Sequence, residues 1–239
     1  MQLADKTALV TGGSDGIGLA IARELKAAGT SVIVVGRNAG RLASAQAEGF
    51  EALEADLSAE AGCAALLRAL GTRTIDIVIN NAGMGSDFDV NAPVDLAATD
   101  RCIFLNLNAP IRLIVGLLDA LKARPTAMIV NVTSGLAIAP NAGSPVYCAT
   151  KAGLRSFTLA LRAQLKGTSI HVLEVLPPVV ETRMTADNNH RKLPAAECAR
   201  QVVAAMAAGR DEANVGMTRW LRVAYSISPA LAGRIMLNY

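Results

Sequence analysis

A tyrosine and a lysine in the second half of the chain have the spacing of a proton-transfer pair. Tyr147 and Lys151 are four residues apart in a stretch of helical period, residues 145–165, so both side chains project from one face. A free tyrosine has a pKa of about 10, too high for proton transfer at neutral pH. Because a nearby ammonium group favours the phenolate, the lysine is expected to lower that pKa. The pair predicts a tyrosine general acid/base assisted by lysine.

A hydroxyl group upstream completes this arrangement. Ser134 lies thirteen residues before Tyr147, in the segment Asn131-Val-Thr-Ser-Gly135 that follows a predicted strand. Its hydroxyl can hydrogen-bond a substrate oxygen that Tyr147 protonates or deprotonates. Thr133 is the neighbouring hydroxyl and the alternative.

A glycine-rich loop near the N-terminus has the features of a phosphate-binding turn. Thr11–Gly18 reads Thr-Gly-Gly-Ser-Asp-Gly-Ile-Gly and joins a predicted strand to a predicted helix. Glycines at 12, 16 and 18 permit a tight turn and a close approach of the backbone to a pyrophosphate, which the first helical amides and the helix dipole attract. The spacing G-x-x-x-G-x-G differs from the dinucleotide fingerprint G-x-G-x-x-G, but the order strand, loop, helix is the same.

The residue after the second predicted strand bears on the choice of dinucleotide. A site for NAD places Asp or Glu about twenty residues after the glycine loop, where it accepts hydrogen bonds from the ribose. This chain has Gly36-Arg37-Asn38 there. A guanidinium can pair bidentately with a 2′-phosphate, so Arg37 favours NADP(H) over NAD(H). The alternative is that Arg37 is a solvated arginine and that NAD binds through the backbone. A second basic residue at position 15 would favour NADP(H), but the chain has Asp15 there, so the alternative stays open.

The elements that must position these residues alternate along the chain. Runs of β-branched residues without polar alternation are typical of parallel strands covered on both faces, and the intervening stretches have helical period. No linker divides residues 1–239, so we expect one doubly wound α/β domain with ligands at the carboxyl ends of its strands. The predicted strands are 7–10, 31–35, 50–54, 75–80, 127–132 and 170–176, and the predicted helices are 17–28, 39–47, 59–70, 96–123, 145–165 and 194–208.

One segment has little regular pattern. Residues 177–193 carry Pro177 and Pro178 at one end, Pro194 just beyond the other, and a polar middle from Thr185 to Lys192. A patternless segment of this length is usually a functional lid or a mobile loop. Its position after a strand favours a substrate lid, and a surface excursion is the alternative.

These motifs occur in one order and resemble those of the short-chain dehydrogenase/reductase family of single-domain type, over essentially the whole chain. The motifs are Thr11–Gly18, Asn80-Asn-Ala-Gly83, Ser134 and Tyr147-x-x-x-Lys151. The resemblance implies a seven-stranded parallel Rossmann sheet, whose last strand would be Asn214–Met217. It also implies hydride transfer between nicotinamide C4 and a small-molecule carbonyl or alcohol, and a homodimer or homotetramer. A cofactor-binding regulator without catalysis is the second hypothesis; it predicts lost catalytic residues.

The resemblance also assigns roles. Asp56 would contact the adenine amino group, the Asn80–Gly83 turn would pass beside the cofactor, and Thr182 would bond the nicotinamide carboxamide. Asn106, Ser134, Tyr147 and Lys151 would be catalytic. The implied cofactor-binding set is Thr11, Gly12, Ser14, Asp15, Gly16, Ile17, Gly18, Arg37, Asp56, Leu57, Asn81, Ala82, Gly83, Tyr147, Lys151, Pro177, Val180 and Thr182.

Two asparagines compete for the family's fourth catalytic position. Pro110 lies inside the predicted helix 96–123 and has no N–H, so the carbonyl of Asn106, four residues earlier, loses its helical partner. Such a carbonyl is a natural water site, and Asn106-Leu-Asn-Ala fits the family's pattern. Asn106 is therefore preferred, with Asn108 as the alternative.

Departures from the family's usual sequence narrow the relationship. Pro177-Pro178 replaces the usual Pro-Gly, which stiffens the loop. The chain resembles bacterial oxidoreductases associated with D-alanine esterification (Dlt type) in this feature, in the Asn106–Arg112 segment and in the C-terminal tail. By position, the substrate pocket would be lined by Gly83–Gly85, Leu136–Ile138, Val146, Val179 and the 183–193 part of the lid.

Composition limits the class of protein. Twenty-three basic and 20 acidic residues give a net charge of +3, too small and dispersed for a nucleic-acid binder. The sequence has no run of 18 or more apolar residues, so no membrane-spanning helix is expected. Residues 1–10 do not have the charged and then apolar pattern of a signal peptide. Four scattered cysteines and two histidines argue for reduced thiols, a cytoplasmic protein and no metal site.

The C-terminal tail, residues 220–237, combines apolar residues with Arg222 and Arg234, and Arg219 precedes it. Binding at a membrane surface is one interpretation. Packing at a subunit interface is the simpler one.

Overall fold

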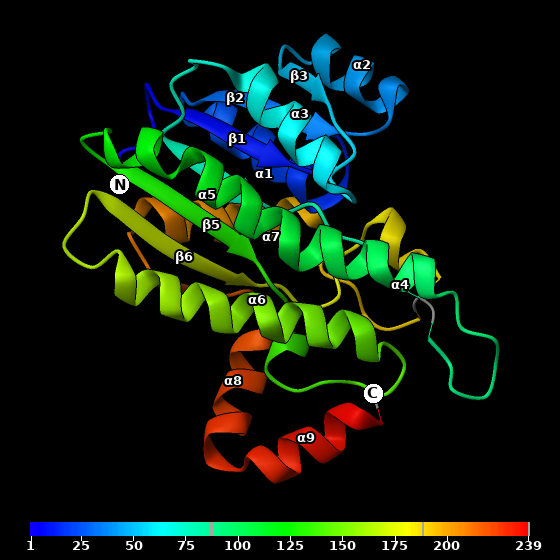
Figure 1. The fold of residues 1–239 in the computed structure, drawn as a ribbon. Coiled ribbons are helices and arrows are strands. Elements are labelled where there is room, and N and C mark those ends of the chain that lie inside the picture. The colour runs from blue at the N-terminus through cyan, green and yellow to red at the C-terminus, as the bar shows by residue number, and fades with distance from the viewer. Residues whose placement is uncertain (87, 188, 239) are drawn as a thin grey trace.

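Seven parallel strands form the central sheet of this computed structural model, which describes residues 1–86, 88–187 and 189–238 (Figure 1). Their order is β3-β2-β1-β4-β5-β6-β7, and each neighbouring pair is parallel. The predicted doubly wound Rossmann sheet is therefore confirmed. The strands are β1 (Thr7–Thr11), β2 (Ser31–Gly36), β3 (Glu51–Glu54), β4 (Ile77–Asn80), β5 (Ala127–Val132), β6 (Ile170–Leu176) and β7 (Glu212–Asn214).

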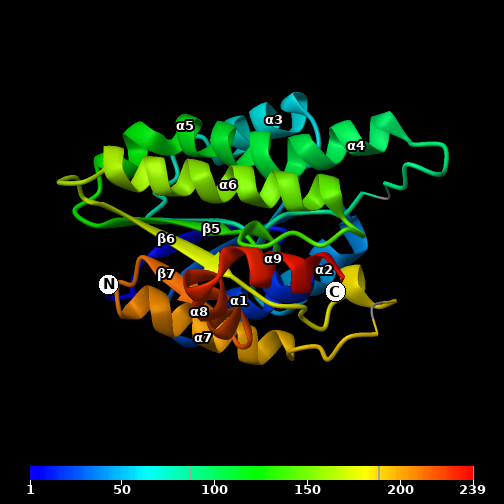
Figure 2. The ribbon, with the colours of Figure 1, turned by 90° about the horizontal axis from the view of Figure 1, so that it is seen from below.

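Helices cover both faces of the sheet, with α3, α5 and α6 on one side and α1 and α7 on the other (Figure 2). The helices α8 and α9 follow β7 and lie apart from these layers. The bounds are α1 (Gly16–Ala27), α2 (Ala39–Ala47), α3 (Glu60–Leu70), α4 (Leu96–Ile103), α5 (Ala109–Lys122), α6 (Pro145–Gln164), α7 (Ala195–Ala207), α8 (Thr218–Ile227) and α9 (Pro229–Leu237), with single turns at Gly135–Ala137 and Arg183–Thr185.

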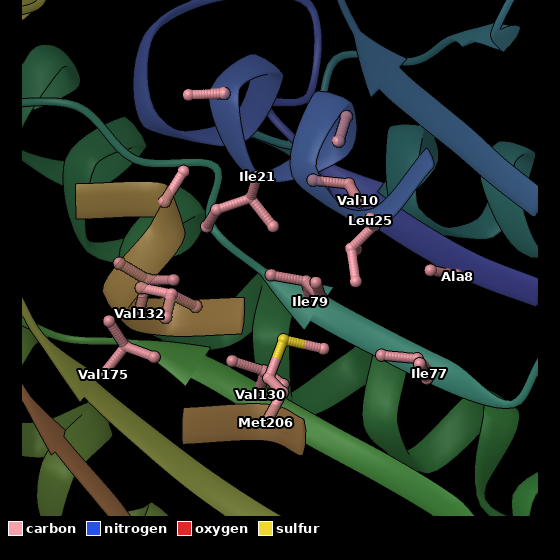
Figure 3. Packing of buried hydrophobic residues seen from close by; sticks show 14 of the residues in the cluster. Ala8, Val10, Ile21, Leu25, Ile77, Ile79, Val130, Val132, Val175 and Met206 are labelled. Atoms are coloured by element: carbon pink, nitrogen blue, oxygen red, sulfur yellow. The ribbon is translucent and has the colours of Figure 1, made fainter. Parts of the chain in front are cut away.

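Alternate residues of each strand enter two separate cores. In β1, Ala8 and Val10 pack towards Ile21 and Leu25 of α1, whereas Leu9 points to the opposite helical layer. Figure 3 shows the first of these cores, in which β4 and β5 side chains meet α1 and α7. Since both faces are buried, the strands carry apolar residues at nearly every position, and this is why they read as continuous β-branched runs.

The predicted last strand, Asn214–Met217, is wrong except at its first residue. β7 covers Glu212–Asn214, and its ladder to β6 ends at Asn214. The chain then turns: Gly216 has a φ of 55°, and the Thr218 amide donates to the Val215 carbonyl at 3.1 Å. A residue in the left-handed region cannot continue a strand, so the turn ends β7 here.

The predicted helix 96–123 is interrupted by a wide turn. Phe104–Asn108 form a π-helical segment between α4 and α5, in which the Ala109 amide donates to the Phe104 carbonyl. Pro110 follows at once and supplies no amide for the usual ladder. Single π-turns inside α-helices are frequent at functional sites, so this segment supports the sequence argument for Asn106.

The same helical segment bears on the expected absence of a membrane span. Within the part of the chain that the structure describes, Leu96–Lys122 is long and apolar enough to cross a membrane by length and composition alone. The core helix of a soluble protein passes the same test. Here Leu113, Ile114 and Leu117 of the segment are buried in the core beneath the sheet.

Loops leaving the carboxyl ends of β1, β4, β5 and β6 meet at one edge of the sheet. The strand order reverses between β1 and β4, and ligands of open α/β sheets bind beside such a reversal, at the carboxyl ends of the strands. The glycine loop, the Asn80–Gly83 turn, Ser134 and the 177–193 segment all begin there.

Candidate active site

The glycine loop is held by the turn after β4. The Thr11 hydroxyl accepts the amides of Asn81 and Ala82, both at 3.0 Å, and donates to the Ile79 carbonyl. The Asn81 side chain donates to the Thr11 carbonyl at 2.9 Å. Asn80 meanwhile donates to Asn131 of β5 at 2.8 Å, so the two asparagines join neighbouring strands. Thr11 and Asn81 thus shape the loop.

Close backbone contacts explain two of the loop glycines. A Cβ at position 18 would lie 2.3 Å from the Gly12 carbonyl oxygen and 2.4 Å from Asn81 Nδ2. Gly12 has a φ of 64°, and a Cβ there would lie 3.0 Å from the Ala82 backbone. Any side chain at either position would displace the loop, so its shape requires glycine.

Asp15 lies between two arginines from distant parts of the chain. Its carboxylate caps α1 by accepting the Gly16 amide at 2.8 Å. It also accepts from Arg41 Nη1 of α2 at 3.0 Å and lies 3.6 Å from Arg183 Nε of the predicted lid. Sequence reasoning missed Arg41, which lies in the first turn of α2, four residues after Arg37. That spacing was the available signal.

A second ion pair lies beside it. Arg37 Nη1 is 3.8 Å from Asp56 Oδ2, and both side chains are more than half exposed. Asp56 Oδ1 accepts the Ser58 amide, and the next residue, Leu57, is buried. Although partial burial raises the pKa of Asp56, the Ser58 hydrogen bonds and the Arg37 charge lower it below its usual value. Ser14 lies against Gly36 nearby, so these residues gather at the carboxyl ends of β1, β2 and β3.

Tyr147 and Lys151 share a face of α6, as their spacing predicted. Lys151 Nζ lies 5.6 Å from the centre of the Tyr147 ring and donates to the Val132 carbonyl at 2.8 Å. The Ser134 side chain is close enough to the Tyr147 hydroxyl to lower its pKa. Ser134 in turn accepts the Leu136 amide at 3.1 Å, which fixes its rotamer. The structure therefore brings the three side chains together.

The pKa of Tyr147 differs from the sequence expectation. Burial raises the pKa of Tyr147 to about 12, although the Ser134 side chain lowers it in part. Burial also lowers the pKa of Lys151 to about 8. The protein by itself therefore does not lower the pKa of Tyr147 as the nearby lysine predicted. Burial destabilises the charged phenolate more than the Ser134 side chain stabilises it.

The alternative hydroxyl, Thr133, is occupied elsewhere. Thr133 is buried and donates to Glu174 Oε1 at 2.8 Å. Neighbouring side chains of an extended segment point to opposite sides, so Thr133 points away from the side that Ser134 faces. The neighbouring serine is the one that meets the tyrosine.

Asn106 is wholly buried and clamps the loop after β4. Its Oδ1 accepts the Met84 amide, and its Nδ2 donates to the Met84 carbonyl, both at 2.9 Å. A Cβ at Gly83 would lie 3.3 Å from Asn106 Oδ1 and 3.6 Å from Lys151 Nζ. The asparagine therefore lies next to the Tyr147–Lys151 pair, whereas Asn108 is exposed.

The predicted lid turns back on itself above the glycine loop. The Pro177 carbonyl accepts the Gly135 amide, and Val180 pairs with Leu193 in an isolated parallel bridge. The methyl group of Thr182 lies against Gly16, only 3.1 Å from where a Cβ would stand. The segment thus contacts the expected cofactor loop, while Asn188, part of the predicted lid, lies outside the described residues.

The remaining predicted pocket residues surround this centre with small and apolar groups. Leu136, Val146 and Val179 are half-buried, and Met184 is 56% exposed. Among residues 1–86, 88–187 and 189–238, no group of three His, Cys, Asp or Glu side chains could hold a metal ion.

A sequence model described as short chain dehydrogenase matches residues 6–193. The chain belongs to the short-chain dehydrogenase family. Among proteins similar to it, the uncharacterized oxidoreductase DltE of Bacillus subtilis (strain 168) is 39% identical over 197 residues, which cover 80% of this chain and 78% of DltE. The similarity to Dlt-type oxidoreductases predicted from the sequence is thereby confirmed.

Two further relatives carry names that refer to a dinucleotide. A probable NADP-dependent dehydrogenase of Haemophilus influenzae (strain ATCC 51907 / DSM 11121 / KW20 / Rd) is 37% identical over 176 residues, 72% of this chain and 70% of that protein. A short-chain dehydrogenase from Sphingobium yanoikuyae, solved in complex with NADPH, superposes with a TM-score of 0.82 at 27% identity, covering 95% of each chain. This short-chain dehydrogenase shares their fold and oxidoreductase class.

Proposed function

We propose that this short-chain dehydrogenase is an NADP(H)-dependent carbonyl reductase, or in reverse an alcohol dehydrogenase, acting through Asn106, Ser134, Tyr147 and Lys151. One observation carries the proposal: Tyr147, Lys151 and Ser134 lie together at the edge of the sheet where the glycine loop begins, with Lys151 Nζ 5.6 Å from the centre of the Tyr147 ring. The alternative, a regulator that binds cofactor without catalysis, would be expected to lack one of these side chains.

The residues present fit a dinucleotide phosphate. The loop at Gly12, Gly16 and Gly18 has no Cβ atoms, and its backbone leads into the N-terminus of α1, which attracts a pyrophosphate. Arg37 and Arg41 both follow β2, and each now pairs with a carboxylate that a 2′-phosphate could replace. The relatives named for NADP(H) support the same choice.

When bound, the nicotinamide supplies or accepts the hydride at a carbonyl carbon. Ser134 holds the substrate oxygen by a hydrogen bond, and Tyr147 gives that oxygen its proton during reduction. Lys151, as an ammonium group, stabilises the phenolate left behind. Asn106 holds the 83–85 backbone beside Lys151, and its carbonyl, deprived of an amide partner by Pro110, binds the water that returns a proton.

We further expect a homodimer or homotetramer, as in the family resemblance, and a cytoplasmic protein. Support for the compartment comes from the four cysteines, all buried and unpaired, which suit a reducing environment.

Thermal unfolding with each cofactor tests the proposal. A ligand that binds only the folded chain at about 100 times its Kd stabilises it by roughly 2.7 kcal/mol. We expect a clear rise in Tm with NADPH and a smaller one with NADH, followed by NADPH oxidation when carbonyl compounds are added. No shift with either cofactor would contradict the proposal, and a shift without any NADPH oxidation would favour the regulator that binds cofactor without catalysis.

Arg37→Asp is expected to change the cofactor preference. Losing a charge-assisted pair with the 2′-phosphate and adding a repelling carboxylate should raise the Kd for NADPH by about 10- to 100-fold while leaving that for NADH nearly unchanged. Titration of protein fluorescence with both cofactors measures the ratio. Arg68→Asp on exposed α3 is the matched control, and an unchanged ratio in Arg37→Asp would remove this arginine from the site.

The pH profile of reduction should report Lys151. Burial lowers the pKa of Lys151 from 10.5 to about 8, so its charge is complete near pH 6 and is lost as the pH rises through 8. We expect the reduction rate to fall over that range, because an uncharged amine no longer stabilises the Tyr147 phenolate. Lys151→Arg should be slower yet keep a flat profile, since guanidinium stays protonated. Lys166→Arg, which is exposed, should keep the wild-type profile. If the reduction rate of Lys151→Arg fell over the same pH range, the pH dependence would belong to a group other than Lys151.

A further inference from the structure

The two C-terminal helices present their apolar residues to solvent. In α8, Trp220, Val223 and Ile227 follow the spacing of one helical face and are 58%, 49% and 80% exposed. In α9, Leu231 and Ile235 are one turn apart and 57% and 60% exposed. We call these five side chains the tail face. An exposed apolar group of this kind on a helix pair marks an interaction surface.

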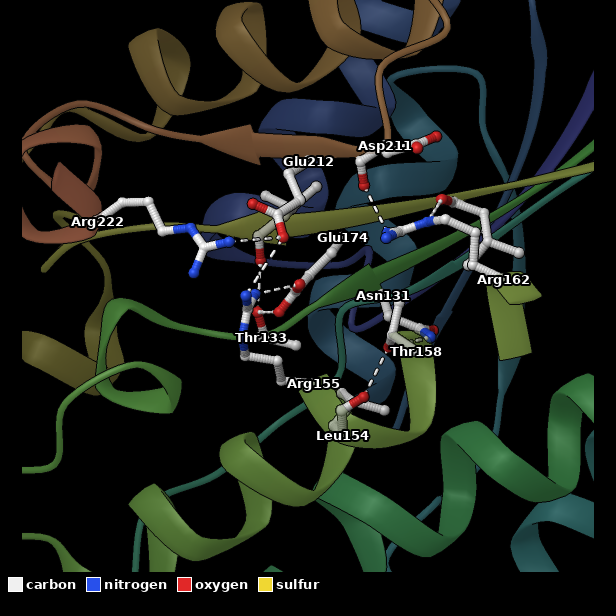
Figure 4. Close-up of polar contacts among 12 residues, drawn as sticks. Asn131, Thr133, Leu154, Arg155, Thr158, Arg162, Glu174, Asp211, Glu212 and Arg222 are labelled. Atoms are coloured by element: carbon white, nitrogen blue, oxygen red, sulfur yellow. Dashed lines mark hydrogen bonds and ion pairs between the residues drawn. The ribbon is translucent and has the colours of Figure 1, made fainter. Parts of the chain in front are cut away.

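The opposite side of α8 is the one that holds the helix to the domain, and it mixes polar and apolar side chains. Thr218 is buried and lies against Gly135. Arg222 pairs with Glu212 of β7 at 3.6 Å, and Glu212 also accepts from Arg155 of α6 at 3.2 Å (Figure 4). The side of α8 that faces the domain is thus anchored by Thr218 and Arg222, whereas Trp220, Val223 and Ile227 face outward without such contacts.

The charged side chains that the two helices carry are all arginines. Residues 213–239 contain three arginines and no aspartate or glutamate. Arg222 is neutralised by Glu212, Arg219 stacks on the Trp220 ring at 5.2 Å, and Arg234 is exposed on α9. The tail face is thus a cationic apolar surface, and its complement is an anionic apolar one.

We propose that α8 and α9 bind the surface of an anionic phospholipid bilayer through the tail face. Helices that lie in a membrane interface combine Trp and aliphatic side chains on one face with Arg or Lys beside them. A second copy of the chain fits less well, because residues 213–239 offer the arginines of another copy no aspartate or glutamate to pair with. Neither the cofactor nor the catalytic residues enter this inference.

The position of the helices supports such docking. In Figure 1 they lie together below the sheet and its helical layers, and Figure 2 looks at them from that side. The helices α8 and α9 lie beyond residue 193, where the match to the short chain dehydrogenase sequence model ends. Since Thr218 and Leu221 pack on Gly135, next to Ser134, docking would bring the substrate edge of the domain towards the bilayer.

Vesicle binding of the full chain tests the proposal. Vesicles of phosphatidylcholine alone are compared with vesicles that contain about one third phosphatidylglycerol, by flotation and by fluorescence. The chain has one tryptophan, Trp220, so its emission reports the tail face directly. We expect flotation and a blue shift with the anionic vesicles, both reversed by high salt, and little of either with phosphatidylcholine alone.

Variants that keep Trp220 identify the surface. Ile227→Ser with Leu231→Ser should weaken binding more than about tenfold, since both side chains would leave the apolar phase. Arg234→Gln should weaken it about fivefold, the effect of one cation near an anionic surface. Matched controls are Val90→Ser, which is 80% exposed in a loop, and Arg68→Gln on α3. Equal thermal unfolding of all variants shows that they fold.

Two results would overturn the proposal. One is equal binding, or no binding, to the two kinds of vesicle. The other is a dimer in lipid-free solution that Ile227→Ser with Leu231→Ser dissociates and Val90→Ser does not, because a second copy would then be the occupant of the tail face.

Discussion

Replacing Tyr147 with phenylalanine is expected to lower turnover by about 10²- to 10⁴-fold, the usual contribution of a positioned general acid or base. The ring remains on α6 beside Lys151, so the packing changes little, but no hydroxyl meets Ser134. The Kd for NADPH, measured by fluorescence titration, should stay within about twofold, since the lost proton donor acts on the substrate. A large fall in kcat with an intact Kd is the signature of this residue.

The matched control is Tyr225→Phe, which removes a tyrosine hydroxyl from a half-buried position of α8, a helix outside the proposed catalytic set. It should turn over at the wild-type rate. If Tyr147→Phe retained full activity, the proton would have to come from another group, and the proposed roles of Ser134 and Lys151 would fail with it.

The fold was predictable because local and global preferences agree along most of the chain. β5 and β6 begin and end where their apolar runs do, since both faces of each strand are buried. β7 was misplaced for a related reason: Glu212–Asn214 is a three-residue edge strand with no apolar run of its own, and its pairing with β6 defines it. The π-turn at Phe104–Asn108 likewise depends on wider packing, although Pro110 marked its neighbourhood.

The candidate site was predictable where one element carries the geometry. Tyr147 and Lys151 lie on one helix, so their spacing alone brings them together. The partners of Asp15 come from α2 and the predicted lid, and only the folded chain joins them. Burial around Tyr147 is also a property of the fold, and it reverses the direction of the predicted pKa change.

A buried ion pair behind the site gives the largest expected effect on stability. Glu174 of β6 is fully buried, and it accepts hydrogen bonds from Arg155 of α6 and from Thr133 (Figure 4). Arg155→Met would leave this carboxylate without its counter-charge, which costs about 3–5 kcal/mol in such pairs. The free energy of unfolding by urea should fall by that amount, and the Tm by roughly 6–20 °C.

The dependence of this loss on pH distinguishes a lost counter-charge from lost packing. Burial already raises the pKa of Glu174 despite Arg155, so the variant should raise it further. A carboxyl whose pKa is higher in the folded chain than in the unfolded one is stabilising only below the unfolded value, and that contribution disappears as the pH rises through the folded value. The deficit of Arg155→Met should therefore be smaller near pH 5 than near pH 8.

Two comparisons complete the test of Arg155. Arg155→Met with Glu174→Gln removes both charges and should recover much of the loss, because no unpaired ion remains buried. Arg23→Met breaks the exposed pair between Arg23 and Glu48 and should cost less than about 1 kcal/mol. If Arg155→Met cost no more than Arg23→Met, or the same at both pH values, Glu174 would not depend on Arg155. Packing alone would then hold α6, β6 and Thr133 together.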